Sequence, residues 1–271
     1  MKYDVYGIGN ALVDKEFEIE DDFLKEFSIE KGMMTLVDRE QQDQLLSELT
    51  QRYAVKARSG GGSAANTLYA VSQFGGSAFY SCRVANDETG DFFLRQLGDH
   101  NIQTNKNRQR EEGVSGRCIV MVTPDGERTM HTYLGVSDSI SIAEMDFEAA
   151  SNCEYMYLEG YLVTSDTARS AIIEMKDFAK SNGIKTAMTF SDPSMLEYFN
   201  DNVNEVLSDG VDLLFCNLQE AQLWSGEEDL DKAVEALKTI AKQFAVTTGA
   251  DGSLLWDCLL YTSDAADDGL C

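Results

Sequence analysis

The sequence predicts an α/β protein whose mostly parallel sheet is covered by helices on both faces. Between residues 155 and 247, short apolar runs alternate with longer stretches of helical periodicity, the pattern of parallel strands joined by helices. A hydrophobic content of 43% with 21 glycines provides for a sizeable core and many turns. No internal repeat and no Pro/Gly/Ser-rich linker divides the chain, so residues 1–256 are expected to form one domain.

The first part of the chain mixes extended and helical segments. Residues 3–8 have strand character and end at Gly7-Ile8-Gly9-Asn10, and Leu12 after Gly9 excludes the G-x-G-x-x-G turn of dinucleotide-binding proteins. The elements expected next are a helical turn over 21–27 between short half-exposed strands, one of them at 33–37, a helix over 39–53, a helix from the glycine stretch to Gly75, a strand over 78–84, a helix over 88–97 and an extended segment from Ile102.

The second part opens with a hairpin. Alternating runs over 118–122 and 128–134 flank a Pro-Asp-Gly turn at 124–126, where proline presets φ and glycine accepts positive φ. Ligands of the sheet that follows are expected at the carboxyl ends of its strands. Strands are expected over 155–158, 184–190, 213–216 and 244–247, and helices over 166–181, 193–207, 218–224 and 230–243.

Three consecutive glycines, Gly60, Gly61 and Gly62, precede a helical pattern. Such a run costs backbone entropy and is retained mainly where the chain turns sharply or lets a ligand approach closely. Ser63 or Asn66 is expected to cap the helix, leaving exposed N–H groups that suit a small polar or anionic ligand. A tight loop before an ordinary core helix explains the same residues equally well.

The composition limits the partners of the chain. A net charge of −25, from 22 basic and 47 acidic residues, argues against nucleic acid and membrane as partners. A small phosphorylated ligand stays compatible, because local N–H groups and a divalent cation outweigh a distant, screened field. The six cysteines are scattered without a C-x-x-C pair, which fits buried thiols in a reducing compartment. Since no signal-peptide pattern and no apolar run of ~18 residues occurs, a cytoplasmic location is expected.

Four segments in order resemble a known family. They are Gly7-Ile8-Gly9-Asn10 with Asp14, residues 61–66 with Gly75-Gly76, Asn217-Leu218-Gln219-Glu220, and Val246-Thr247-Thr248-Gly249-Ala250-Asp251-Gly252. With them the chain from Tyr3 to Trp256 resembles the ribokinase-like (PfkB) family of carbohydrate and nucleoside kinases. The Glu127-Arg128-Thr129-Met130 hairpin resembles its adenosine-kinase-like and sugar-kinase-like branch. The resemblance implies a three-layer α/β core with a small β-sheet lid over the substrate, formed by about 16–37 and 113–134.

The resemblance implies a substrate site for a sugar or nucleoside. Asp14, at the carboxyl end of a strand, would accept hydrogen bonds from two vicinal hydroxyls. Asn66 would add donors and acceptors, and the backbone of Gly61 and Gly62 would let the sugar ring come close. A solvated strand-end acid and a helix cap remain the alternative explanations of Asp14 and Asn66. Arg128 could reach a phosphate across a closed lid, although an exposed strand arginine explains it more simply.

A second set of residues is implied for ATP and Mg²⁺, the expected cofactors. Asn217 and Glu220 lie near magnesium and the phosphates in the family, where Glu220 would hold the metal indirectly through water. The same pair has the spacing of a helix capping box, and this spacing does not distinguish capping from a role near magnesium and the phosphates. Thr248 and Gly249 would lie near the nucleotide, with a hairpin turn at 250–252 as the alternative.

The Gly-Ala-Gly-Asp motif of the family, which supplies an anion hole and the base for the hydroxyl proton, does not occur in this sequence. Residues 257–271 follow neither strand nor helix periodicity and are expected to be foreign or disordered. The sequence therefore predicts a fragment of an ATP-dependent kinase acting on a hydroxymethyl group of a sugar or nucleoside, inactive because it lacks the general base. The alternative is a non-catalytic sugar- or nucleoside-binding module or a degenerate paralogue. A homodimer through apolar lid edges is also expected.

Overall fold

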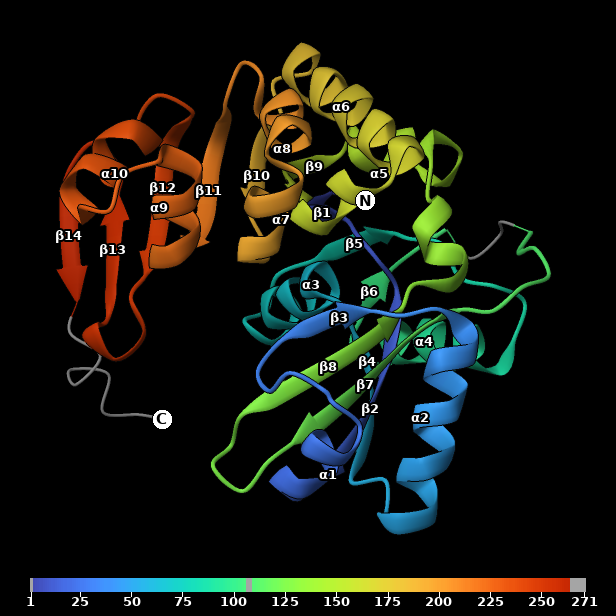
Figure 1. The fold of residues 1–271 in the computed structure, drawn as a ribbon. Coiled ribbons are helices and arrows are strands. Elements are labelled where there is room, and N and C mark those ends of the chain that lie inside the picture. Colours follow the sequence, from blue (N-terminus) through green and yellow to red (C-terminus); the bar gives the residue numbers. More distant parts are fainter. Residues whose placement is uncertain (1, 106–108, 264–271) are drawn as a thin grey trace.

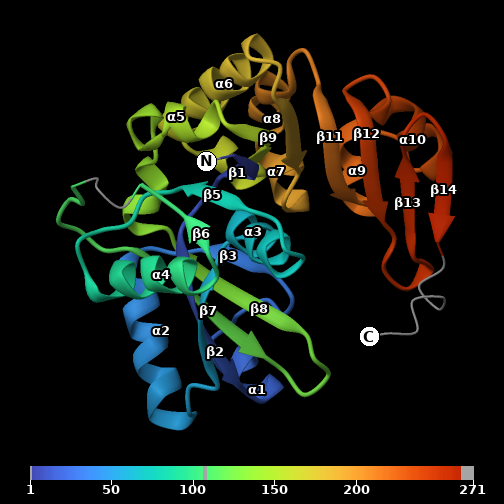
Figure 2. The same cartoon turned by 180° about the vertical axis from the view of Figure 1, so that it is seen from behind.

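The computed structural model describes residues 2–105 and 109–263, which form two sheets with helices packed against them (Figures 1 and 2). Within this part of the chain the larger sheet has the order β14-β13-β12-β11-β10-β9-β1-β5-β6. Its strands are parallel from β6 to β12, and β13 and β14 are antiparallel additions. Their bounds are β1 Tyr3–Ile8, β5 Ala78–Ser81, β6 Ile102–Gln103, β9 Cys153–Leu158, β10 Lys185–Thr189, β11 Val211–Asn217, β12 Ala241–Thr247, β13 Ser253–Trp256 and β14 Leu260–Ser263.

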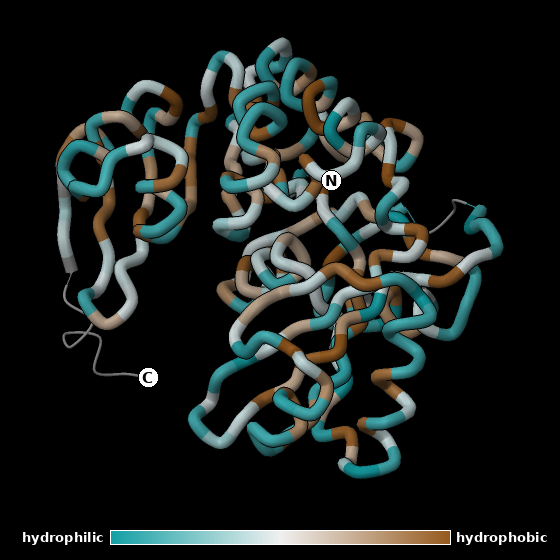
Figure 3. Tube along the Cα trace, in the orientation of Figure 1, coloured by the Kyte–Doolittle hydropathy of each residue, from teal (hydrophilic) through white to brown (hydrophobic). Residues whose placement is uncertain are grey.

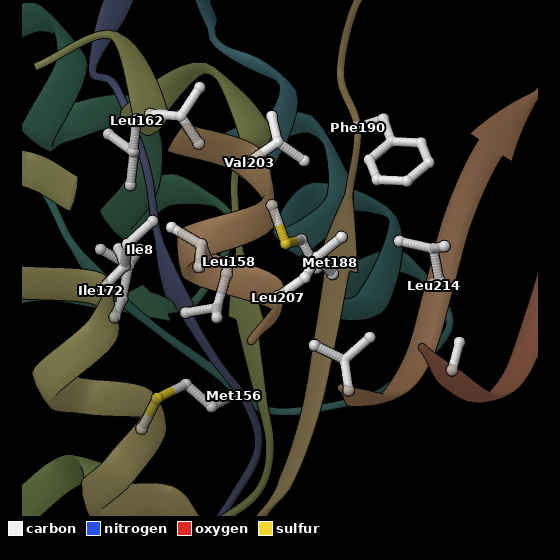
Figure 4. Packing of buried hydrophobic residues seen from close by; sticks show 14 of the residues in the cluster. Ile8, Met156, Leu158, Leu162, Ile172, Met188, Phe190, Val203, Leu207 and Leu214 are labelled. Atoms are coloured by element: carbon white, nitrogen blue, oxygen red, sulfur yellow. The ribbon is translucent and has the colours of Figure 1, made fainter. Parts of the chain in front are cut away.

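Helices cover both faces of the larger sheet, as predicted. On one face Met188 and Leu214 pack against Val203 and Leu207 of a covering helix (Figure 4). On the other face a separate apolar cluster joins the sheet to α3 and α4. The first face is covered by α5 (Phe147–Ala150), α6 (Asp166–Ser181), α7 (Pro193–Tyr198), α8 (Asn200–Leu207), α9 (Leu218–Ser225) and α10 (Leu230–Leu237), and the second by α3 (Ser63–Gln73) and α4 (Glu88–Asp99). The three-layer α/β fold is confirmed.

The α3 side of the sheet stays open toward β14. Phe215, Ala245, Leu255 and Tyr261 are register partners across four neighbouring strands, so their side chains form one row. Phe215, Leu255 and Tyr261 are exposed by 37%, 48% and 49%. This row is an uncovered apolar strip of the sheet.

The smaller sheet has the order β3-β8-β7-β2-β4. Its strands are β2 Leu12–Glu18, β3 Met34–Leu36, β4 Ala57–Gly61, β7 Gly116–Val122 and β8 Arg128–Tyr133. Its outer face is covered by α1 (Asp21–Glu26) and α2 (Arg39–Arg52), through a cluster that includes Phe17, Leu45 and Leu49. Figure 3 shows α2 as mainly hydrophilic with short hydrophobic stretches, as expected of a helix with one buried face.

Both segments expected to form a lid supply strands to this smaller sheet, but β4 was not predicted. Gly60 and Gly61 were expected to lie in a glycine loop before a helix, yet Gly61 pairs with Leu12 and Gly60 with Val13 in an antiparallel ladder. The segment lacks an apolar alternation, so only its tertiary partner β2 makes it a strand.

Two helix predictions were wrong in extent. The helix expected over 193–207 is two helices, because Phe199 has φ −129° and ψ 27° and interrupts the helical backbone. The helix expected over 230–243 ends at Leu237, and β12 begins at Ala241 because that residue pairs with Val211 at the start of β11. Short 3₁₀ segments span Gly135–Ser139, Ile142–Glu144, Gly160–Thr164 and Gly249–Asp251.

The expectation of a disordered segment from Asp257 does not hold for its first residues. Leu260–Ser263 form β14, in which Tyr261 pairs with Leu255 of β13. Residues 264–271 of that segment lie outside the described residues. Among the described helices, none has both the length and the apolar character that crossing a membrane requires.

Candidate functional site

A cavity of about 180 Å³ lies between the inner face of the smaller sheet and the larger sheet. Its lining comes from β2, β3, β7 and β8 on one side, and from α3 and the segments after β1 and β9 on the other. Asp14, Gly62 and Asn66, expected to bind substrate, all line it. The carboxyl ends of β1 and β9 open into this cavity, where ligands of doubly wound sheets bind.

Asp14 carries an unpartnered carboxylate into this cavity. It lies on β2 between Ser59 of β4 and Cys118 of β7, its register partners. No described residue donates a hydrogen bond to it. Burial raises the pKa of Asp14 to about 6, the nearby Arg128 guanidinium lowers it, and Glu16 raises it further. The carboxylate is partly buried and accepts no hydrogen bond from a described residue, so it is free to receive hydroxyl donors of a ligand.

Gly61 and Gly62 shape the backbone beside this carboxylate. A Cβ on Gly61 would overlap both carboxylate oxygens of Asp14. Gly62 has φ +101°, a conformation that favours glycine, and its Cβ would overlap the carbonyl oxygen of Asn10. Gly61 therefore makes room for the acid, and Gly62 lets α3 start close to the end of β1.

The expected caps of α3 are not formed. Gly62 is the N-cap residue, and neither Ser63 nor Asn66 accepts a capping hydrogen bond from the first N–H groups of α3. Asn66 is exposed, with its side chain in the cavity lining, and its backbone N–H bonds to the Gly62 carbonyl at 2.9 Å. The amide of Asn66 is thus not used for capping and faces the same space as Asp14.

Glu159, which sequence reasoning missed, occupies the amino end of α3. Its carboxylate accepts hydrogen bonds from the Ala64 N–H at 2.9 Å, the Ser63 hydroxyl at 2.6 Å and the Asn10 N–H at 2.6 Å. The residue is fully buried, and burial raises its pKa against the lowering effect of these donors. The expectation of free N–H groups at the start of α3 is therefore wrong for Ala64, because its N–H already donates to Glu159.

The side of the cavity formed by the smaller sheet is largely apolar. Leu12, Met34, Met130 and Leu134 line it from the sheet, and Met195 lines it from α7. Arg128 is the cationic member of the lining. It is exposed, and within the described residues no ion pair engages it. The smaller sheet thus brings the Asp14 carboxylate and a surface for a flat apolar group to the same cavity, and Asn66 adds an amide from α3.

Asn217 and Glu220 form the capping box that their spacing predicted. The Asn217 side chain accepts from the Glu220 N–H, and the Glu220 carboxylate accepts from the Asn217 N–H, both at 2.8 Å. Glu220 is 4% exposed. Burial raises its pKa to about 7, the Asn217 N–H lowers it, and Asp192 raises it.

Thr248 and Gly249 lie beside this capping box, at the next strand end. Thr247 is the register partner of Asn217, and Thr248 follows it. The Thr248 hydroxyl and N–H both donate to the Gly252 carbonyl, at 2.8 and 2.9 Å. The turn joins β12 to β13, so the hairpin expected as the alternative is present.

Tyr161 and Asp192 lie between the two sets of residues. Tyr161 lines the cavity, and its hydroxyl is 3.4 Å from the Asp192 carboxylate. Burial raises the pKa of Tyr161, and the carboxylates of Asp192, Glu159 and Glu220 raise it further. This arrangement brings three acids around one phenol, and the sequence hinted at Asp192 only as an acid before Pro193 at a strand end.

No group of three or more His, Cys, Asp or Glu side chains able to hold a metal occurs in residues 2–105 and 109–263. The described cysteines are all free thiols, with Cys118, Cys153 and Cys216 buried and Cys258 exposed, and burial raises the pKa of Cys118 to about 12. A protein-only metal centre is thus not formed by this part of the chain.

Known proteins resemble the chain over most of its length. It is 24% identical over 241 residues to guanosine-inosine kinase of Escherichia coli K12, covering 85% of this chain and 56% of that protein. It is 22% identical over 255 residues to adenosine kinase of Saccharomyces cerevisiae, covering 92% and 74%. The chain thus spans little more than half the length of the first of these relatives.

Solved structures match the fold closely. The crystal structure of adenosine kinase from Sinorhizobium meliloti is 33% identical with a TM-score of 0.90, covering 98% of this chain and 80% of that one. A probable sugar kinase from Rhizobium etli is 30% identical, with the same TM-score and coverage. Residues 33–264 match the family described as pfkB family carbohydrate kinase. The chain therefore belongs to the pfkB family of carbohydrate kinases.

Proposed function

We propose that the chain recognises a nucleoside for an ATP-dependent kinase that phosphorylates its hydroxymethyl group. The observation that carries this proposal is the unpartnered carboxylate of Asp14, which lines the cavity from the same sheet as the apolar side chains of Leu12, Met34 and Met130. A ribose offers two vicinal hydroxyl donors to one carboxylate, and a planar base suits the apolar side. A free sugar would use the first feature and leave the second unfilled. The names of the guanosine-inosine and adenosine kinase relatives agree with this choice.

Each sugar-side residue has a separate task in this proposal. Asp14 accepts from two ribose hydroxyls, and Asn66 donates to or accepts from the ribose at the mouth of α3. Gly61 keeps the space that the Asp14 carboxylate needs, and Gly62 allows the close approach of backbone and ring. Arg128, free of ion pairs with described residues, is available to a phosphate group at the open side of the cavity.

ATP is proposed at the carboxyl ends of β11 and β12, near Asn217, Glu220, Thr248 and Gly249. The Asp192 charge raises the pKa of Glu220, and a cation near this pair would relieve the repulsion. These acids therefore fit Mg²⁺ held through water, with Glu220 as the indirect partner. When bound with ATP, Mg²⁺ would neutralise phosphate charge during transfer.

Isothermal titration tests recognition. Adenosine, guanosine, inosine, ribose and fructose are titrated into the chain and into Asp14→Ala. We expect at least one nucleoside to bind more tightly than ribose, and the variant to lose about 100-fold or more, as removal of two hydrogen bonds to a charged acceptor implies. If Asp14→Ala binds as tightly as the wild type, Asp14 does not contact the ligand. If ribose binds as tightly as the nucleosides, the apolar wall does not contact the base.

A coupled ADP-release assay tests catalysis. The sequence contains no Gly-Ala-Gly-Asp motif, so we expect binding without measurable turnover by the chain as given. Turnover would contradict the proposed absence of the general base. Nucleoside binding without any effect of ATP and Mg²⁺ would favour a binding module instead.

A homodimer through the smaller sheet is proposed at its β3 edge. Met33 and Leu36 there are 46% and 48% exposed, and an unpaired strand edge accepts a second strand. Sedimentation equilibrium of the chain and of Leu36→Lys tests this, because a lysine at the edge opposes pairing. A wild-type monomer at all concentrations would contradict it.

A further inference from the structure

Two methionine side chains face each other on the wall of the cavity. Met34 of β3 and Met130 of β8 are register partners, and both line the cavity. Each is partly buried, whereas Met195 on the opposite side of the cavity is only 2% exposed. Register partners lie within about 5.5 Å of each other, so the two side chains form one sulfur-rich patch.

Of the sulfur groups in this cavity, the thioethers are the reactive ones. A thiol reacts with peroxide as its thiolate, and Cys118, also in the lining, is 4% exposed with a pKa raised by burial to about 12. A thioether needs no deprotonation and reacts wherever peroxide reaches it. Peroxide that enters the cavity therefore meets Met34 and Met130 before it meets an active thiol.

We propose that Met34 and Met130 form an oxidation site at which hydrogen peroxide lowers the affinity for nucleoside. Each sulfur attacks one peroxide oxygen, the O–O bond breaks, and a sulfoxide and water are formed, so the sulfur is oxidised and the peroxide reduced. The sulfoxide places a polar acceptor in the wall that the base would contact, and an imperfectly paired polar group there costs affinity. The effect on binding rests on the proposed function, because it requires the base to lie on this wall.

Met33 provides a matched control. It precedes Met34 in the chain, is 46% exposed and does not belong to the cavity lining. Its carbonyl accepts the Met130 N–H at 2.9 Å, so the backbone around the two positions is continuous while only the Met34 side chain faces the cavity. Oxidation of Met33 is expected to leave nucleoside binding unchanged.

The test treats the folded chain with graded hydrogen peroxide and maps sulfoxides by peptide mass spectrometry. We expect sulfoxide at Met33, Met34 and Met130 while Met195 stays reduced, and protection of Met34 and Met130 by added nucleoside. Titration of adenosine or guanosine before and after treatment is expected to show at least a tenfold loss of affinity. Methionine sulfoxide reductases A and B together are expected to restore it.

Two variants separate this site from general damage. The double variant Met34→Leu, Met130→Leu should keep after peroxide whatever affinity it had before, while Met33→Leu should lose affinity as the wild type does. Met34 and Met130 remaining reduced at a dose that oxidises Met33 would overturn the inference, as would undiminished affinity of the oxidised wild type. No nucleoside binding before treatment would refute the proposed function and with it the effect on affinity. If the untreated chain binds nucleoside and peroxide does not lower the affinity, the oxidation site is refuted and the proposed function is not.

Discussion

Asparagine in place of Asp14 is expected to stabilise the fold while weakening nucleoside binding about 100-fold. Burial raises the pKa of Asp14 from 3.8 to about 6, so ionisation is harder in the folded protein than in the unfolded chain. Above pH 6 Asp14 is ionised in both states, and the ionised form is less favourable in the folded state, so it lowers the free energy of unfolding. A shift of about two units corresponds to about 3 kcal/mol, which is the upper limit of the gain from Asp14→Asn.

The sign of this effect sets its pH dependence. Well below pH 3.8 both states keep Asp14 protonated, and the variant should gain nothing. Between pH 4 and 6 the wild type loses stability relative to the variant, because only the unfolded chain releases the proton freely. Above pH 6 the difference should be constant.

Urea unfolding followed by tryptophan fluorescence at pH 4, 5, 6, 7 and 8 measures the difference. Glu18→Gln is the control, since Glu18 lies on the same strand, is exposed and pairs only with Lys56 on the surface. We expect no pH-dependent gain from it. A variant Asp14→Asn that is less stable at pH 8, or whose gain is the same at pH 4 and 8, would refute this account of the carboxylate.

The nucleoside affinity of the wild type should rise with pH, whereas its stability relative to Asp14→Asn falls. Only the ionised form of Asp14 accepts from two hydroxyls, so the wild-type affinity is expected to fall about tenfold per pH unit below about 6. The affinity of Asp14→Asn, weaker by about 100-fold, should not change over the same range. A wild-type affinity that stays constant from pH 7 to 5 would contradict this.

The remaining predictions concern the backbone, the proposed metal site and the proposed phosphate contact. Gly62→Ala should destabilise the fold by about 2 kcal/mol or more in urea unfolding, because φ is +101° and the new Cβ meets the Asn10 carbonyl; unchanged stability would contradict the close approach. Glu220→Gln should keep the fold but weaken Mg²⁺-dependent ATP binding in calorimetry, and EDTA should erase the difference. Arg128→Ala should weaken ATP binding several-fold, whereas Arg95→Ala, which removes an exposed arginine of α4, should not. Equal effects of the two variants would mean that Arg128 acts only through the net charge of the protein.

Most of the larger sheet could be predicted from the sequence because its strands are short apolar runs between amphipathic helices. The prediction failed where a partner decides the conformation. The β4 segment contains Gly60 and Gly61 and has no strand propensity, and its pairing with β2 is a long-range contact. The end of α10 was likewise set by β11, with which Ala241 pairs, and helical periodicity alone continues past Leu237.

The candidate site shows the same division. Asn66 lies in the first turns of α3, as its helical pattern indicated. Asp14 was expected at the carboxyl end of a strand and instead lies within β2, yet both residues line one cavity. Glu159 is also an acid after an apolar strand, and that position was its only sequence signal. Its role depends on reaching Ser63 and Ala64, about a hundred positions earlier in the chain, which no local pattern reveals.

The carboxylate of Glu159 also limits which ligand groups can bind at the amino end of α3. Because the Ala64 N–H and the Ser63 hydroxyl at the amino end of α3 already donate to Glu159, these two donors are not free for a phosphate ester, while Asp14 nearby can still accept from a hydroxyl. Under the proposed function, a nucleoside would be held through its unmodified sugar hydroxyls at Asp14. Its phosphorylated product would carry the same hydroxyls and keep the same contact.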